Sequence, residues 1–181
     1  MLEVSTADGT RFGRAADGTY SAYGYRYVLP QRFTYQPAGS KNLRFSFVSL
    51  DRSTTPDSVL VGEYDVDGEG TRLVRWNIDH TDRELVATGA KATASWAYQV
   101  DIRSMQGVNS VRGKYFISRS NGKGSRGDLI TWKPGQDATI HTGALPSGPE
   151  DLAYRRSTDE MWTVSEYPGD RHVFSVTAGK F

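Results

Sequence analysis

The sequence predicts an all-β fold, and within that class a β-propeller with about three to four four-stranded blades in this chain, alone or as part of a larger ring. The main observation is an internal repeat, in which Leu50–Thr54 returns as Tyr154–Thr158. Each copy is followed by an apolar run that closes in Glu-Tyr, at Tyr64 and at Tyr167. A degenerate third copy, Asn109–Ser118, lies between these two. It halves the spacing between copies to about fifty residues, which is within the range of propeller-blade periods.

The second observation is the pattern of strands and turns along the chain. Small or polar residues alternate with aromatic ones along Thr19–Val28, which is the period of a strand. The chain has 19 Gly and 7 Pro, and they fall between the apolar runs as turn residues would. The remaining strands are expected at Leu43–Leu50, Ser58–Val66, Thr71–Ile78, Lys114–Arg119, Asp128–Trp132, Glu160–Glu166 and His172–Val176, with edge strands at Glu84–Thr88 and Ala138–His141.

These elements group into one domain or propeller fragment that covers residues 1–181. Its blade-like repeats are expected at about 20–88, 93–142 and 150–181. Trp76, Trp132 and Phe174 are expected at equivalent positions of the repeats, as aromatic residues that pack one blade on the next.

Composition narrows the classes of partner. The 181 residues hold 22 Lys plus Arg against 21 Asp plus Glu, so the net charge of +1 predicts no binding to nucleic acid. No apolar run reaches the roughly 18 residues that a membrane-spanning helix needs. The chain has no cysteine, and Met1–Ser5 has neither the basic nor the apolar region of a signal peptide.

Several segments resemble secreted actinobacterial (Streptomyces-type) proteins of the β-propeller class. The segments that carry this resemblance are Ala22–Gln31, Ser49–Ser58, Met105–Val108 and Pro149–Gly169. It extends from about Tyr20 to Val176 and corresponds to the C-terminal half of the family. The resemblance implies a propeller fold and export from the cell, and it transfers no catalytic residue.

Metal ligands are few. Asp65 and Asp67 flank a turn before Gly68, and alternating carboxylates of this kind can bind calcium. The full calcium-binding loop is absent, so an ordinary Asp-Gly hairpin turn explains the same residues. The three histidines, His80, His141 and His172, lie in different repeats and show no zinc-ligand spacing.

The candidate ligand-binding residues include two pairs at the starts of inner strands, Gln106-Gly107 and Glu150-Asp151. Equivalent positions of a repeat project to equivalent points around the axis, so both pairs are expected near one mouth of the central channel. Gly107 would let a ligand approach the backbone closely, while the polar side chains would donate and accept hydrogen bonds. The alternative is that these residues only tie neighbouring blades together.

Aromatic side chains supply the other candidates. Tyr23 and Tyr25 share one face of a predicted strand, and Trp96 and Tyr98 share a face of another. An apolar ring with a polar tip suits sugar rings or protein surfaces. The alternative is that these rings fill the space between blades.

Two functions remain open on this evidence. The first is a secreted recognition module that binds a glycan or a protein partner through the propeller loops and channel mouth. The second is a hydrolase or lyase on the same scaffold that uses Glu150, Asp151 or a histidine with bound calcium. Propellers host both classes, so the fold does not separate them. If the ring does not close within one chain, a second chain is expected to complete it, because open edge strands invite pairing.

Overall fold

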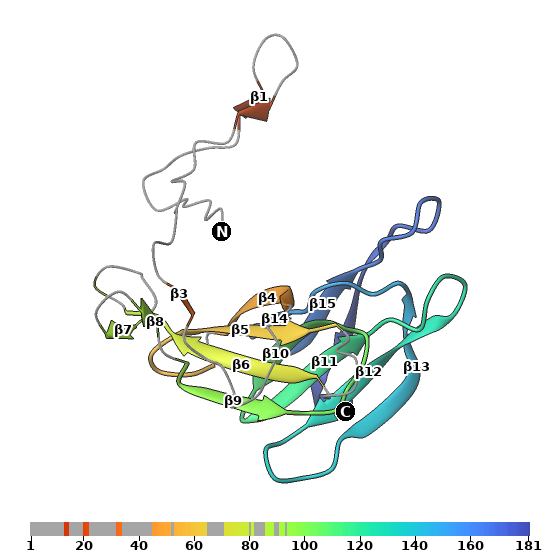
Figure 1. The fold of residues 1–181 in the computed structure, drawn as a ribbon. Helices are drawn as coiled ribbons and strands as arrows, with labels where there is room; N and C mark the ends of the chain where they lie inside the picture. The colour runs from red at the N-terminus through yellow and green to blue at the C-terminus, as the bar shows by residue number, and fades with distance from the viewer. Residues whose placement is uncertain are drawn as a thin grey trace.

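The computed structural model describes residues 13–14, 20–21, 32–33, 45–51, 53–64, 71–79, 81, 86–88, 91–92 and 94–181. This part of the chain is all-β, as predicted, and three antiparallel sheets of three or four strands dominate it (Figure 1). Its one helical element is the short 3-10 turn η1 (Ala178–Lys180). Among the described residues, no helix has the length and apolar character needed to cross a membrane.

The first sheet runs in the order β4 (Phe45–Asp51), β5 (Ser58–Glu63), β6 (Arg72–Asn77) and β9 (Trp96–Gln99). Side chains along β4 are alternately buried and exposed, which is the period-2 pattern that the sequence predicts for a strand. The outer strand is β9, which pairs with β6, so this sheet extends past the boundary at residue 88 expected from the repeat.

The second sheet contains β10 (Met105–Val111), β11 (Lys114–Arg119), β12 (Arg126–Trp132) and β13 (Thr139–Ser147). The third sheet contains β14 (Ala153–Arg155), β15 (Glu160–Val164) and β16 (Val173–Thr177). The strands of the second and third sheets follow one another in the sequence, whereas in the first sheet the chain passes through β7 and β8 between β6 and β9. The described part of the third sheet therefore has three strands where four were expected.

Five short strands lie outside these sheets: β1 (Gly13–Arg14), β2 (Tyr20–Ser21), β3 (Arg32–Phe33), β7 (Ala87–Thr88) and β8 (Lys91–Ala92). β1 pairs with β2, and β8 pairs with both β3 and β7. The edge strand predicted at Glu84–Thr88 is therefore wrong as an outer strand of the first sheet. Its described end is β7, which belongs to a separate small sheet.

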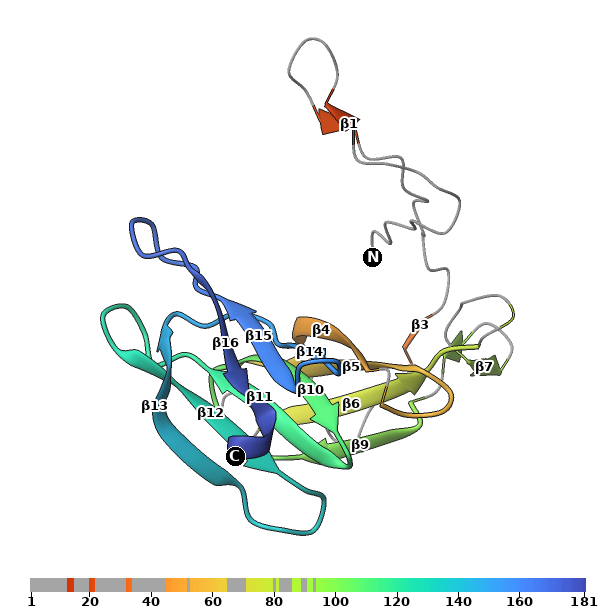
Figure 2. The same ribbon diagram turned by 180° about the vertical axis from the view of Figure 1, so that it is seen from behind.

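The three sheets pack face to face around their first strands. β10 lies against β4 and β5 on one side and against β14 on the other (Figures 1 and 2). β4, β10 and β14 are called the inner strands below. One apolar cluster fills the space between the first and second sheets, and includes Leu60, Leu73, Val108 and Ile117. A second cluster, which includes Phe116, Leu129, Leu152 and Met161, fills the space between the second and third sheets.

The strand registers show which positions of the three sheets are equivalent. Val59 of β5 pairs with Trp76, Tyr115 of β11 pairs with Trp132, and Met161 of β15 pairs with Val176. Trp76 and Trp132 therefore occupy equivalent positions, as predicted. The prediction is wrong for the third repeat, where Val176 takes this position and Phe174 lies two residues earlier.

A side-chain interaction closes the same end of the second hairpin in each sheet. In the first sheet, Glu63 forms a two-point ion pair with Arg72. In the second sheet, Arg119 and Asp128 form an ion pair with the charges exchanged. In the third sheet, the hydroxyl of Ser165 accepts a hydrogen bond from the backbone N–H of His172 at 2.9 Å. An arginine–carboxylate ion pair in either orientation, or a single hydroxyl, thus serves one structural position.

Candidate functional site

The inner strands bring the two predicted residue pairs together. A Cβ atom added at Gly107 would lie 2.5 Å from the Asp151 Cα and 2.5 Å from the Leu152 nitrogen. The backbone that leads into β14 therefore packs directly on Gly107. The sequence predicted that a ligand would approach this glycine closely. In the structure the chain's own backbone occupies that place.

The carboxylate of Asp151 ties the third sheet to the first. Its Oδ1 accepts hydrogen bonds from the Ser49 hydroxyl at 2.6 Å and from the Leu152 N–H at 2.8 Å. Asp151 as a residue is exposed, but this oxygen is occupied by its two donors. Burial raises the pKa of Asp151, while the two hydrogen bonds act in the opposite direction. Asp151 therefore joins two sheets, which is the structural role that the sequence analysis gave as the alternative to ligand binding.

A cluster of hydroxyls around a buried carboxylate joins the first and second sheets. Asp51 is fully buried, and its Oδ1 accepts hydrogen bonds from the backbone N–H and the hydroxyl of Ser53. Its Oδ2 accepts a hydrogen bond from the Ser110 hydroxyl at 2.6 Å, and the hydroxyls of Ser53 and Ser110 also contact each other. Buried polar atoms that are hydrogen-bonded in this way fix the relative position of the strands that carry them.

A pair of glutamates lies where the chain enters the third sheet. An isolated antiparallel bridge pairs Pro149 with Ser165, so Glu150 lies opposite Val164 and Glu166 lies opposite Gly148. The two glutamates are diagonal neighbours, and their side chains are close enough to share a hydrogen bond. Glu150 is half-buried and Glu166 is exposed. Burial is the largest cause that raises the pKa of Glu150, and the charge and hydrogen bond of Glu166 and the charge of Asp151 raise it further.

This electrostatic arrangement predicts a pH-dependent contribution to stability. A carboxyl whose pKa is raised on folding stabilises the fold below its usual pKa of 4.5, and this contribution is lost as the pH rises through the raised value. Glu150→Gln is therefore expected to reduce the fall in unfolding free energy between pH 4.5 and neutrality. Urea denaturation at a series of pH values measures it.

Glu160 provides a control of opposite sign. Its pKa is lowered, chiefly by a hydrogen bond from Thr158, with further hydrogen bonds from Trp162 and Ser175. Its contribution is therefore present above pH 4.5 and lost as the pH falls through the lowered pKa. Glu160→Gln should lower stability at neutral pH more than at acid pH. Identical pH profiles for the two variants would contradict the opposite directions of the pKa shifts of Glu150 and Glu160.

The aromatic candidates lie in the interior or outside the described part of the chain. Trp96 and Tyr98 are half-buried and pack against Tyr115 and Trp132, with ring centroids 4.9 to 5.6 Å apart. They therefore fill the space between the first two sheets, which was the alternative to ligand binding. Residues outside the described part include Tyr23 and Tyr25 and the predicted calcium ligands Asp65 and Asp67.

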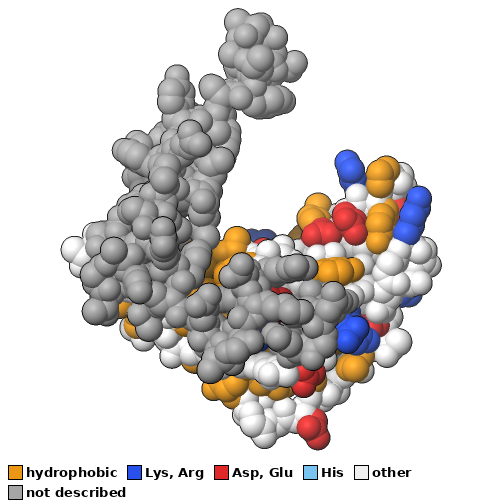
Figure 3. Space-filling view, viewed as in Figure 1, with side chains coloured by type: hydrophobic (Ala, Val, Ile, Leu, Met, Phe, Trp, Pro, Cys, Tyr) orange, Lys and Arg blue, Asp and Glu red, His pale blue; other side chains and the backbone are white. Residues whose placement is uncertain are grey.

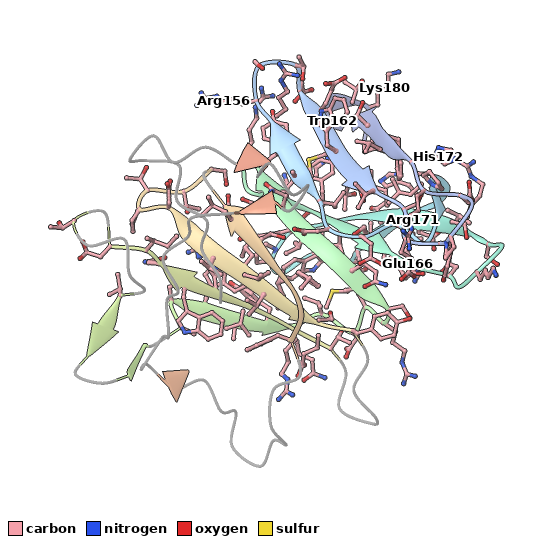
Figure 4. The ribbon with its side chains drawn as sticks, turned by 90° about the horizontal axis from the view of Figure 1, so that it is seen from above. Arg156, Trp162, Glu166, Arg171, His172 and Lys180 are labelled. Carbon is pink, nitrogen blue, oxygen red and sulfur yellow. The ribbon has the colours of Figure 1, made fainter. Side chains whose placement is uncertain are left out.

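Charged residues and one tryptophan lie near the two ends of the third sheet. Glu166, Arg171 and His172 lie near the turn between β15 and β16, whereas Arg156, Trp162 and Lys180 lie toward the other end of the sheet (Figure 4). His172 Nε2 lies 2.9 Å from Asp170 Oδ1, and the Nε of Arg171 donates to the Glu166 carbonyl. In the parts of the chain that the structure describes, no group of three His, Cys, Asp or Glu residues could hold a metal ion.

Two residues of this region were missed by the sequence analysis as site residues. Glu166 appeared only as part of the repeated Glu-Tyr, and Ser49 only as part of a strand. The antiparallel bridge between Pro149 and Ser165 makes Glu166 a diagonal neighbour of Glu150, and their side chains interact. The contact between Ser49 and Asp151 spans 102 positions of the chain, and no local pattern signals it.

Comparison of the chain with family models, with curated proteins and with solved structures finds no match.

Proposed function

We propose that the chain is a recognition module built as three blades of a β-propeller, and that it binds a glycan or a protein partner where the inner strands begin. Three observations support the propeller architecture: the strands of each sheet pair in the order of the sequence, the sheets pack face to face, and the first strands lie side by side. The resemblance to secreted propeller proteins supports export and adds no ligand.

The observation that carries the binding proposal is the carboxyl pair Glu150 and Glu166. The fold holds these two side chains together although their proximity disfavours ionisation of Glu150. Perturbed carboxyls in partly open positions cluster at functional sites, because they are retained there despite their electrostatic cost. Carboxylates accept hydrogen bonds from sugar hydroxyls or peptide N–H groups, and the half-buried Gln106 would add a donor and an acceptor.

A glycan array tests this proposal with the wild-type chain and with Glu150→Gln and Glu166→Gln. A ligand that bonds to these carboxylates should bind about 10- to 100-fold more weakly to each variant, the range for losing a hydrogen bond to a charged group. Asp137→Asn is the matched control, because Asp137 is an exposed acid in the turn before β13. If the ligand binds both glutamate variants as tightly as the control, the site lies elsewhere.

The same glutamate pair supports a second candidate, a hydrolase or lyase. A half-buried carboxyl with a raised pKa beside a second carboxyl is an arrangement that suits general acid catalysis on glycosides. In this case, ligands identified on the array would be cleaved by the wild-type chain, and Glu150→Gln would remove turnover while binding persists. A calcium ion at Asp65 and Asp67 stays a prediction; loss of activity with a chelator would support it.

A further inference from the structure

The outer face of the third sheet is formed by Ala153, Trp162, Val164, Val173 and Ser175, and it has no neighbouring sheet among the described residues. Leu73 and Leu129 occupy the same position in the first two sheets, and both are 0% exposed against the sheet that follows. The equivalent residue here is Val173, which is 69% exposed. Hydrophobic and charged side chains lie side by side around the projecting hairpin of β15 and β16 (Figure 3).

In the part of the chain that the structure describes, the inner strand of the first sheet likewise has no sheet packed on its outward side. Val108 and Leu152 point toward the preceding sheet, and they are 0% and 1% exposed. Val48 takes the equivalent position in β4 and is 44% exposed, with Leu50 beside it at 45%. On this face the cluster of Val61, Val74 and Trp76 is already buried, so the open part is the inner strand.

We infer that these two surfaces pack on each other between two copies of this chain, with the third sheet of one copy against β4 of its partner. Each surface is one half of a contact that the chain already makes twice internally. In those contacts an inner strand lies against the preceding sheet, as β10 lies against β4 and β5. A second copy fits better than an unrelated partner, because both halves occur on one molecule. Two such contacts related by twofold symmetry form a closed head-to-tail pair.

The internal contacts also predict which residues meet. Asn109 Nδ2 of the second sheet donates to the Leu152 carbonyl of the third sheet at 3.4 Å. By strand register, Ala153 is the equivalent of Asn109, and Val48 is the equivalent of Leu152. Ala153 of one copy should therefore lie beside Val48 of the other copy.

Light scattering over a range of concentrations tests the pairing. The expected mass is about 40 kDa, twice the 20.1 kDa of one chain. Val173→Asp and Val48→Asp should each weaken the pair at least about tenfold, because both place a charge in an apolar contact. Ile140→Asp is the control, since Ile140 is 49% exposed on β13 and lies outside both surfaces.

Mixing the two variants distinguishes the head-to-tail pair from a pair in which the two third sheets pack on each other. In the mixed pair one contact carries both substitutions while the other is wild-type, so association should partly recover. Recovery is not expected if two third sheets pack on each other, since Val48→Asp would then have no effect. A mass of 20.1 kDa at every concentration, or a mixture without recovery, overturns the proposal.

Cross-linking keeps the test valid if an aspartate variant fails to fold. The chain has no cysteine, so Ala153→Cys and Val48→Cys introduce unique thiols. A bis-maleimide should join a mixture of the two variants and should leave each variant alone as single chains. Cross-linking of Ala153→Cys to itself, or none in the mixture, would overturn the head-to-tail contact.

Discussion

Gly107→Ala is expected to lower the free energy of unfolding by about 3 kcal/mol, the upper end of the range for forced overpacking. The new Cβ would lie 2.5 Å from two backbone atoms, the Asp151 Cα and the Leu152 nitrogen. Backbone cannot rotate away as the end of a side chain can, so the entry to the third sheet must shift. That shift would also pull Asp151 from Ser49. Urea denaturation measures the loss.

Gly113→Ala is the matched control for this substitution. Gly113 has a φ of +77° and nothing within 4 Å of an added Cβ, so it tests backbone conformation without crowding. An alanine there should cost about 1 kcal/mol, the penalty for a left-handed residue with a side chain. If Gly107→Ala costs no more than this control, the close packing of β10 on the entry to β14 is wrong.

Arg72→Met is expected to destabilise the fold by about 3–5 kcal/mol, because it would leave a buried carboxylate without its cation. Glu63 is 0% exposed and Arg72 is 5% exposed. Two 2.7 Å hydrogen bonds join their side chains, and the Arg72 N–H donates to the same carboxylate at 3.0 Å. Thermal and chemical denaturation both report the effect.

The double substitution Glu63→Gln with Arg72→Met shows whether charge is the cause. Removing both charges leaves a neutral amide that needs no ion partner, so the double variant should regain most of the stability lost by Arg72→Met. Arg119→Met provides a comparison in the second sheet, where the arginine is more exposed than Arg72 and a smaller loss is expected. Equal losses in the double and single variants would show that packing, not charge, determines the effect.

The strands were predictable because their signals are local. Alternation of side chains and turn residues marked β4, β5 and β6 within a few residues of their observed ends. The outer strand β9 was misplaced into the second repeat because it follows a long connection, and only its pairing with β6 assigns it to the first sheet. Local pattern indicates that a strand exists, whereas its neighbour depends on contacts distant in sequence.

The repeat was informative for its first half and misleading for its second. Leu50 and Tyr154 do occupy equivalent positions in their sheets. Glu63 and Glu166 match in sequence, yet strand register makes Ser165 the equivalent of Glu63. The connections before β5 and β15 differ in length, so the two glutamates have different environments: one is buried in an ion pair and the other is exposed beside Glu150.

The sequence predicted where the candidate site residues lie, but not what they do there. Repeat geometry predicted that Gln106-Gly107 and Glu150-Asp151 would lie near each other, and Gly107 does contact Asp151. What these residues do there depends on Ser49 of β4 and on Glu166, which follows β15. Trp96 and Tyr98 showed the opposite difficulty, because an aromatic pair on one strand face is equally compatible with a ligand surface and with a core.

The pairing of strands that are adjacent in sequence has a consequence for the order in which the chain folds. The strands of the second and third sheets, and β4, β5 and β6 of the first, meet after closing only short loops, so they can pair early. The bond from Ser49 to Asp151 closes a loop of 102 positions and requires all three sheets to be in place. We therefore expect the junction on Gly107 to form late in folding and to join the three sheets into one cooperative unit.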